Sequence, residues 1–146
     1  MTAKQYLSEV IKLKKKAQSL SRKEKELRTK AEGLRAITYD KDRVQVSTGD
    51  QMPDIVALMI EVQKDYATTV AECYRQIKER EDRIGALKSV RQIDVLRWRY
   101  LEDKDGRQYT FEEIAEIMVI QDKSSVINLH KRAIKAFANR WKMTLE

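Results

Sequence analysis

The sequence is poor in the residues that form tight turns, with four glycines and one proline among 146 residues. Folds made of many short strands need such residues at their turns, so helices are the expected elements. No stretch reaches the roughly 18 consecutive apolar residues of a membrane span, or resembles the apolar core of a signal peptide. We therefore expect an all-α, cytoplasmic protein with no membrane partner.

Cysteine and histidine are also scarce, since Cys73 and His130 each stand alone. One cysteine cannot form an internal disulfide, and one residue of each type cannot supply a tetrahedral zinc site within one chain. Cys73 falls on an apolar helical stripe and is expected to be buried by packing. For His130 we expect a solvent-facing or phosphate-contacting role rather than catalysis or metal binding.

The sequence contains no Gly-rich phosphate loop, no Ser, His and Asp set, and no motif that places a base beside a nucleophile. Asp40 and Asp42 form an acidic pair, but turn formation is the ordinary role of such residues. We therefore expect no enzymatic activity and no cofactor.

Positive charge is in excess, with a net charge of +7, and the excess lies at the amino end. Residues 1–37 hold 11 Lys and Arg against 4 Asp and Glu. Such a balance favours a polyanion as partner. The basic residues alternate with leucines, however, so a solvated outer face of a coiled coil explains them better than an arm that grips DNA.

Apolar residues recur every seven positions over residues 1–37, as in a coiled coil. One series is Tyr6, Leu13, Leu20, Leu27 and Leu34, and the other is Val10, Ala17, Glu24 and Ala31. A helix of this length, about 55 Å at 1.5 Å per residue, needs a partner along its seam.

A second seam provides that partner, at Val56, Met59, Gln63, Tyr66, Val70, Cys73, Ile77, Arg80, Ile84 and Leu87. Its helix is expected to begin near Asp50 as cap and Pro53 in the first turn. Residues 38–52 are expected to form a loop, with a short extended piece at Val44–Val46. Residues 1–88 then form a long helical hairpin, or the leucine series pairs with a second copy as a homodimer; the sequence does not choose between them.

The last part of the chain, residues 89–146, is expected to be a separate helical domain. Val90, Ile93, Leu96 and Tyr100 share one face of a helix that ends at the turn residues 103–106. Thr110 and Glu113 then form a capping box at the start of a short helix. Its inward residues are Phe111, Ile114, Ala115 and Met118, and those of the following helix are Val126, Leu129, Ala133, Ile134 and Phe137. Two such helices joined by a short turn are the elements of a helix-turn-helix. Trp98 and Trp141 are expected to pack in this domain.

These residues also carry a family resemblance. The run VLRWRYLEDKDGRQYTFEEIAEIM followed by SSVINLHKRAIKAF resembles region 4 of sigma-70 factors, above all in EEIAEIM and in Val126, Leu129, Arg132, Ala133 and Ile134. The whole chain, including YDKDRVQVSTGDQMPDIV, resembles phage and prophage transcriptional regulators related to the ArpU and RinA late-gene activators. The resemblance implies promoter binding in phage or mobile-element transcription, with RNA polymerase as a candidate second partner. The chain departs from the sigma pattern at Val119–Gln121, where a glycine-containing turn is usual.

A recognition helix reads double-stranded DNA with the outward side chains near its start. These are Lys123, Ser124, Ser125, Ile127, Asn128, Lys131 and Arg132. Asn128 suits an adenine edge, the two serines a base or a phosphate, and Ile127 a thymine methyl group. Lys123, Lys131 and Arg132 suit phosphates. Thr110 and Arg107, at the start of the preceding helix, are further phosphate candidates.

The leading hypothesis is therefore a sequence-specific transcriptional regulator. The alternative is a DNA-packaging recognition subunit of a phage terminase, which also joins a helix-turn-helix to a helical oligomerisation element. In such proteins the DNA-binding part usually comes first, whereas in this chain it comes last. A purely structural coiled-coil adaptor accounts for residues 1–88 but leaves the capping box and the helix-turn-helix pattern unexplained.

Overall fold

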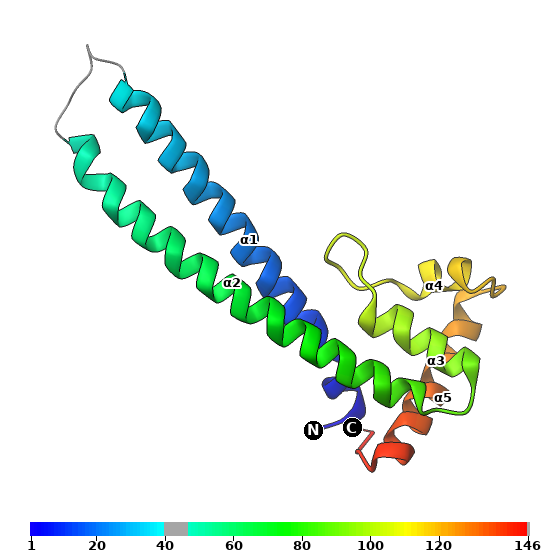
Figure 1. The fold of residues 1–146 in the computed structure, drawn as a ribbon. Coiled ribbons are helices and arrows are strands. Elements are labelled where there is room, and N and C mark those ends of the chain that lie inside the picture. The colour runs from blue at the N-terminus through cyan, green and yellow to red at the C-terminus, as the bar shows by residue number, and fades with distance from the viewer. Residues whose placement is uncertain (40–46, 146) are drawn as a thin grey trace. The chain divides into compact units, whose positions relative to one another are not determined.

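The computed structural model describes residues 1–39 and 47–145, and the side chains of residues 1–35 and 52–145. Every regular element in these ranges is helical, which confirms the expected fold class (Figure 1). The elements are α1 (Ala3–Tyr39), α2 (Ser47–Gly85), α3 (Val90–Leu96), the π-helix η2 (Arg97–Leu101), α4 (Phe111–Ile117) and α5 (Lys123–Trp141). Within these ranges we find no helix with the length and apolar character needed to span a membrane.

The chain divides into two compact units. The first unit contains Met1–Lys15 and Glu72–Glu146, and the second contains Lys16–Ala71. Residues 1–15 and 72–88, which the expected boundary at residues 88 and 89 assigned to a hairpin, thus belong with the C-terminal helices. The reason is that Leu7 of α1 and Ile84 of α2 are fully buried in the same core as α3, α4 and α5.

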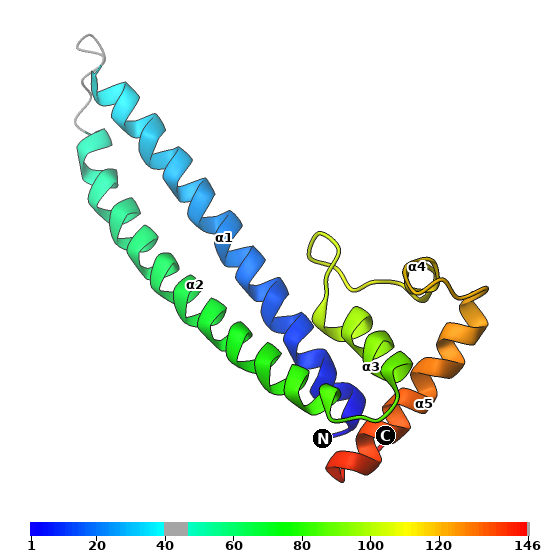
Figure 2. The same cartoon turned by 45° about the vertical axis from the view of Figure 1, so that its right-hand side comes forward.

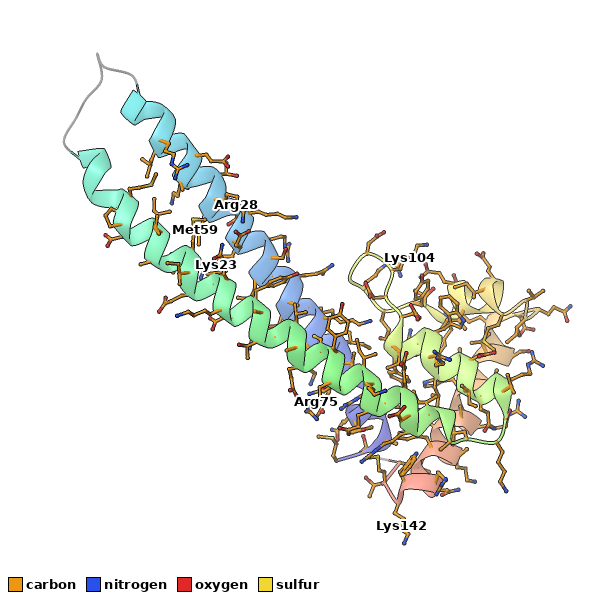
Figure 3. The ribbon with its side chains drawn as sticks, viewed as in Figure 1. Lys23, Arg28, Met59, Arg75, Lys104 and Lys142 are labelled. Atoms are coloured by element: carbon orange, nitrogen blue, oxygen red, sulfur yellow. The ribbon has the colours of Figure 1, made fainter. Side chains whose placement is uncertain are left out.

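In the second unit, the end of α1 and the start of α2 lie side by side and run in opposite directions (Figures 1 and 2). Gln63 Nε2 donates a hydrogen bond to Glu24 Oε1 across the pair, at 3.2 Å. A groove of about 310 Å³ separates the two helices farther along, and its walls include Arg28 of α1 and Met59 of α2 (Figure 3). This unit is the antiparallel pairing of the two seams, which is one of the two arrangements that the sequence allows.

The seam of α1 has the expected register in this unit, since Leu27 is buried and Leu20 and Leu34 are half-buried. The register of α2 differs from the prediction. Val56 and Gln63 are exposed, whereas their neighbours Ile55 and Val62 are half-buried and buried. The more buried positions of α2 thus come one residue before the predicted ones here, while Val56 and Gln63 still line the groove beside α1.

The start of α2 also differs from the prediction. The helix begins at Ser47, so residues 47–52 are helical and Pro53 lies in the second turn rather than the first. Asp50 is a helical residue and not the cap. Pro53 cannot donate the backbone hydrogen bond that a residue at this place normally gives, and the helix continues through it. The extended piece expected at Val44–Val46 lies outside the described residues.

The first unit has one continuous apolar core. Its buried members are Ala3, Tyr6, Leu7, Ile84, Leu87, Val95, Leu96, Tyr100, Leu101, Ile114, Ala115, Val126, Leu129, Ala133, Ile134, Phe137 and Ala138. Trp98 and Trp141 pack against this core, as expected, and Trp141 Nε1 donates to the backbone oxygen of Arg83 at 3.0 Å. The amide of Ala3 donates to the backbone oxygen of Thr144 at 2.9 Å, which ties the start of α1 to the segment after α5.

Cys73 is buried, as predicted, and burial raises the pKa of its thiol.

The segment before α4 contains one tight turn that the sequence predicts. Lys104 and Arg107 pair through their backbones, and the two residues between them, Asp105 and Gly106, have φ angles of 52° and 86°. Positive φ at both central positions makes the turn compatible with flanking extended chain, and an Asp-Gly pair is well suited to it. Upstream, the predicted inward position of Val90 is wrong, because this first residue of α3 is 69% exposed.

Candidate nucleic-acid interface

The short helix α4 begins with the predicted capping box. The Thr110 side chain accepts a hydrogen bond from the amide of Glu113 at 3.2 Å, and the Glu113 carboxylate accepts one from the amide of Thr110 at 3.1 Å. Two amides that a helix start leaves unpaired are thereby satisfied. Ile114 and Ala115 are buried beneath α5, so the box fixes α4 where its inward face meets that helix.

The turn after α4 uses a valine where a glycine is usual. The amide of Ile120 donates to the carbonyl of Ala115 at 2.8 Å, and that of Val119 donates to Glu116 at 3.3 Å. This pair of bonds is a Schellman motif, which places its C′ residue in the left-handed region. That residue is Val119, with φ of 55°. The turn therefore keeps the usual hydrogen bonds without glycine, at the cost of a strained β-branched residue.

Helix α5 begins at a cap that the sequence analysis did not identify. The Asp122 side chain accepts a hydrogen bond from the amide of Ser125 at 2.8 Å, and this bond lowers the pKa of the Asp122 carboxyl. The pattern Asp followed by Lys, Ser and Ser could have revealed this cap. The inward face is as predicted: the buried residues include Val126, Leu129, Ala133, Ile134 and Phe137. The direction of every other side chain on α5 follows from this burial.

The opposite face of α5 carries the predicted DNA-contacting residues. Lys123, Ser124, Ser125, Asn128, Lys131 and Arg132 are exposed and Ile127 is half-buried. Lys135, one turn after Lys131, is also exposed on this face, and sequence reasoning missed it. Between Lys123 and Trp141 the helix has five Lys and Arg and no Asp or Glu. The outer face of α5 is therefore cationic and carries amide and hydroxyl groups near its start.

His130 does not face solvent, so that expectation is wrong. Its side chain is buried, and Nε2 lies 2.8 Å from the hydroxyl oxygen of Tyr100. Phe111 packs edge-on against the imidazole, with ring centroids 5.1 Å apart. Burial, and then the charges of Arg99 and Lys4, lower the pKa of His130 to about 4. The imidazole is therefore neutral at pH 7 and is unsuited to binding a phosphate.

Three of the predicted residues, Thr110, Arg107 and Lys123, have partners within the protein, and Lys123 Nζ lies 3.7 Å from Glu112 Oε1. Arg107 forms two hydrogen bonds to the Glu113 carboxylate, of 2.6 and 2.9 Å, and Lys104 forms a third of 2.8 Å. These partners hold the pKa of Glu113 well below its usual range. The start of α4 thus carries an ionised carboxylate that already neutralises nearby cations. Lys104 lies on the tight turn before α4 (Figure 3).

Comparisons with models of protein families, with curated proteins and with solved structures give no match for this chain.

Proposed function

We propose that this protein is a sequence-specific DNA-binding regulator of transcription, and that α4 and α5 form a helix-turn-helix whose second helix enters the major groove. The observation that carries the proposal is the asymmetry of α5. One face is fully buried, and the other has several cations, no acidic residue, and the polar side chains of Ser124 and Asn128. Such a face matches the phosphates and base edges of DNA.

The exposed side chains of α5 are of two kinds, those suited to contact bases and those suited to contact phosphates. The amide of Asn128 can both donate to and accept from an adenine edge, so it is the proposed base-reading residue. Ser124 and Ser125 are proposed to contact a base or a phosphate, and Ile127 a thymine methyl group. Lys123, Lys131 and Arg132 are proposed to contact phosphates, which set affinity without reading sequence.

The biological role rests on the resemblance to sigma region 4 and to the ArpU and RinA-related regulators. It supports promoter DNA of phage or mobile elements as the target, activation as the outcome and RNA polymerase as a second partner. The Schellman turn and the cap at Asp122 define the connection between α4 and α5, which supports the fixed geometry that base reading requires.

The decisive experiment is genome-wide mapping of the binding sites in a cell that carries the native genetic neighbourhood of the gene. The test variant is Asn128→Ala/Lys131→Ala, and the matched control is Asn139→Ala/Lys78→Ala, which removes the same groups from exposed positions elsewhere. We expect one sharp peak at a promoter, present with the control and lost with the test variant, together with altered transcript levels. A peak at a packaging start with unchanged transcription would overturn the proposal in favour of a terminase subunit.

A further inference from the structure

A polar groove of about 240 Å³ lies between the start of α3 and the first half of α5. Its polar lining comes from Ser89, Arg91 and Gln92 on one side and from Ser125 and Arg132 on the other. The first three residues play no part in the base-reading face described above. They were not singled out from the sequence, because nothing in it shows that the start of α3 lies against α5.

The two arginines of the groove differ from most other arginines of the same unit. Arg107 pairs with Glu113, Arg97 with Glu81 at 3.6 Å, and Arg80 with Glu9 at 2.8 Å. Among the described residues, Arg91 and Arg132 have no ion-pair partner, and no Asp or Glu lines the groove. Two exposed guanidinium groups from different helices therefore border a cavity that contains no counter-charge.

The other polar groups of the groove can also donate. The Ser89 hydroxyl oxygen accepts from the amide of Gln92 at 3.4 Å, which leaves its own O–H free to point elsewhere. The Gln92 side-chain amide adds an N–H donor. The helix starts themselves are already capped, α3 by Ser89 and α5 by Asp122, so the guanidinium groups rather than free backbone amides make this groove attractive to an anion. A phosphodiester has the charge and the acceptor oxygens that fit.

The position of the groove relative to α5 suggests which phosphate it binds. Lys131 and Arg132 are successive residues, so they diverge by about 100° around the helix axis and flank Asn128 on opposite sides. A helix about 10–12 Å wide fills a major groove about 12 Å wide, and each flank then meets one sugar-phosphate backbone. With α5 in the major groove, Lys131 would face one strand and Arg132, which lines the same groove as Arg91, would face the other.

We propose that the groove between α3 and α5 binds one backbone phosphate of double-stranded DNA, held between Arg91 and Arg132. This inference rests on the proposed function, because it assumes that α5 lies in the major groove. It makes α3 a second DNA-contacting element, which clamps the strand opposite the one that Lys131 meets and so fixes the rotation of α5 in the groove.

The test measures binding of the full chain to a labelled DNA duplex of mixed sequence across about 50 to 200 mM salt. Arg91→Ala and Arg132→Ala should each weaken binding on the order of tenfold and lower the slope of log K against log salt by about 1. Arg97→Ala, which removes an exposed arginine outside the groove, is the control and should change neither quantity much. The double variant should lose less than the product of the single losses, because either single change already releases the shared phosphate.

The outcomes separate the two proposals. If the wild-type chain does not bind DNA, the proposed function fails and this inference with it. If the wild type binds but Arg91→Ala behaves like Arg97→Ala, or the two groove losses multiply independently, the shared phosphate site is overturned while DNA binding by α5 stands. Calorimetry with inorganic phosphate at matched ionic strength is the last arm. Phosphate binding that Arg91→Ala abolishes, with DNA affinity unchanged, would assign the groove to a free anion and overturn its role in DNA binding.

Discussion

The hydroxyl oxygen of Tyr100 and Nε2 of His130 lie 2.8 Å apart in the core beneath the outer face of α5. Tyr100 is 1% exposed and His130 is 5% exposed. Burial raises the pKa of Tyr100 to about 12 and lowers that of His130 to about 4, so both groups are neutral over a wide range of pH. One polar pair thus connects η2 to α5 without placing a charge in the core.

This pair predicts that stability falls in mild acid. The pKa of His130 is about 4 in the folded protein and near its ordinary 6.5 in the unfolded chain, so below pH 6.5 the unfolded state takes up a proton that the folded state does not. The free energy of unfolding should therefore be fully retained above pH 6.5 and fall as the pH is lowered toward 4. Between pH 7 and 5 the expected loss is about 2 kcal/mol. Urea unfolding followed by the fluorescence of Trp98 and Trp141 measures it.

The control for the pH effect is His130→Gln, which removes the titrating group. Its absolute stability is expected to be lower, but its unfolding free energy should be nearly constant from pH 7 to 5. The carboxyl groups whose pKa is lowered, such as those of Glu79 and Glu113, lose their contribution only below their ordinary value of 4.5, outside this window. A variant that still loses stability between pH 7 and 5 as the wild type does would refute the role of His130.

The turn between α4 and α5 predicts a stabilising substitution. Val119 has φ of 55° and is 90% exposed, so glycine at this position relieves strain without removing a buried contact. Val119→Gly should raise the free energy of unfolding by about 1 kcal/mol, measured by urea unfolding at pH 7. The matched control is Val90→Gly, also at an exposed valine but in ordinary helical geometry, which should lower stability slightly, by about 0.3 kcal/mol. Equal losses in both variants would mean that Val119 carries no strain.

The capping box predicts a separation of stability from DNA affinity. Thr110→Ala removes the oxygen that accepts from the amide of Glu113 and should cost about 1 kcal/mol of unfolding free energy. Thr110→Ser keeps that oxygen and should remain close to the wild type. Because the Glu113 carboxylate lies at the start of α4, neither substitution should change the salt dependence of DNA binding. A lower salt slope in Thr110→Ala would instead support the phosphate contact that the sequence suggested for Thr110.

Local pattern predicted much of the fold, and the failures occur where distant partners decide. The capping box and the buried face of α5 need only neighbouring residues, and both are as predicted. In α2, however, the residues Ile55 and Val62 are more buried than the predicted Val56 and Gln63. Both series have the heptad spacing of seven residues. The sequence of α2 alone does not rank them, because the contact surface of α1 decides the register.

Some features of the candidate site could likewise be predicted from local pattern, and others depend on distant residues. Once the inward residues of α5 are known, helical periodicity places Asn128 and Lys131 outward. The same periodicity places His130 inward, four residues after Val126 and four before Ile134, so its burial could have been predicted. Its contacts with Tyr100, thirty residues earlier, and with Phe111 could not. Arg91 gave no signal for the same reason: its place beside α5 results from the packing of α3.

Substitution of Arg80, a charged member of the predicted seam of α2, should cause a large loss of stability. Its side chain is 2% exposed; Nε donates to the backbone oxygen of Tyr6 at 3.0 Å, and the guanidinium pairs with Glu9 at 2.8 Å. Arg80→Ala leaves a cavity and unpaired groups and should cost about 3 kcal/mol of unfolding free energy or more. Arg75→Ala, five residues earlier on the exposed side of the helix, should stay close to the wild type (Figure 3). Similar small losses in both variants, by thermal or urea unfolding, would contradict a structural role for Arg80.

Asn128 and Lys131 predict two different kinds of binding defect. Asn128→Ala removes a group proposed to read a base. The difference in binding free energy between the mapped site and random DNA should therefore fall by about 1 to 3 kcal/mol, with the salt slope unchanged. Lys131→Ala removes a phosphate contact, so affinity should fall equally on both DNAs and the slope should decrease by about 1. Both side chains are exposed, so circular dichroism should report an intact fold in each variant. Fluorescence anisotropy at several salt concentrations measures, for each variant, the affinities for the mapped and random DNA and the salt slope. Equal losses of both variants on the mapped and random duplexes would mean that α5 approaches the phosphates without presenting Asn128 to the bases, and sequence reading would have to come from another part of the chain.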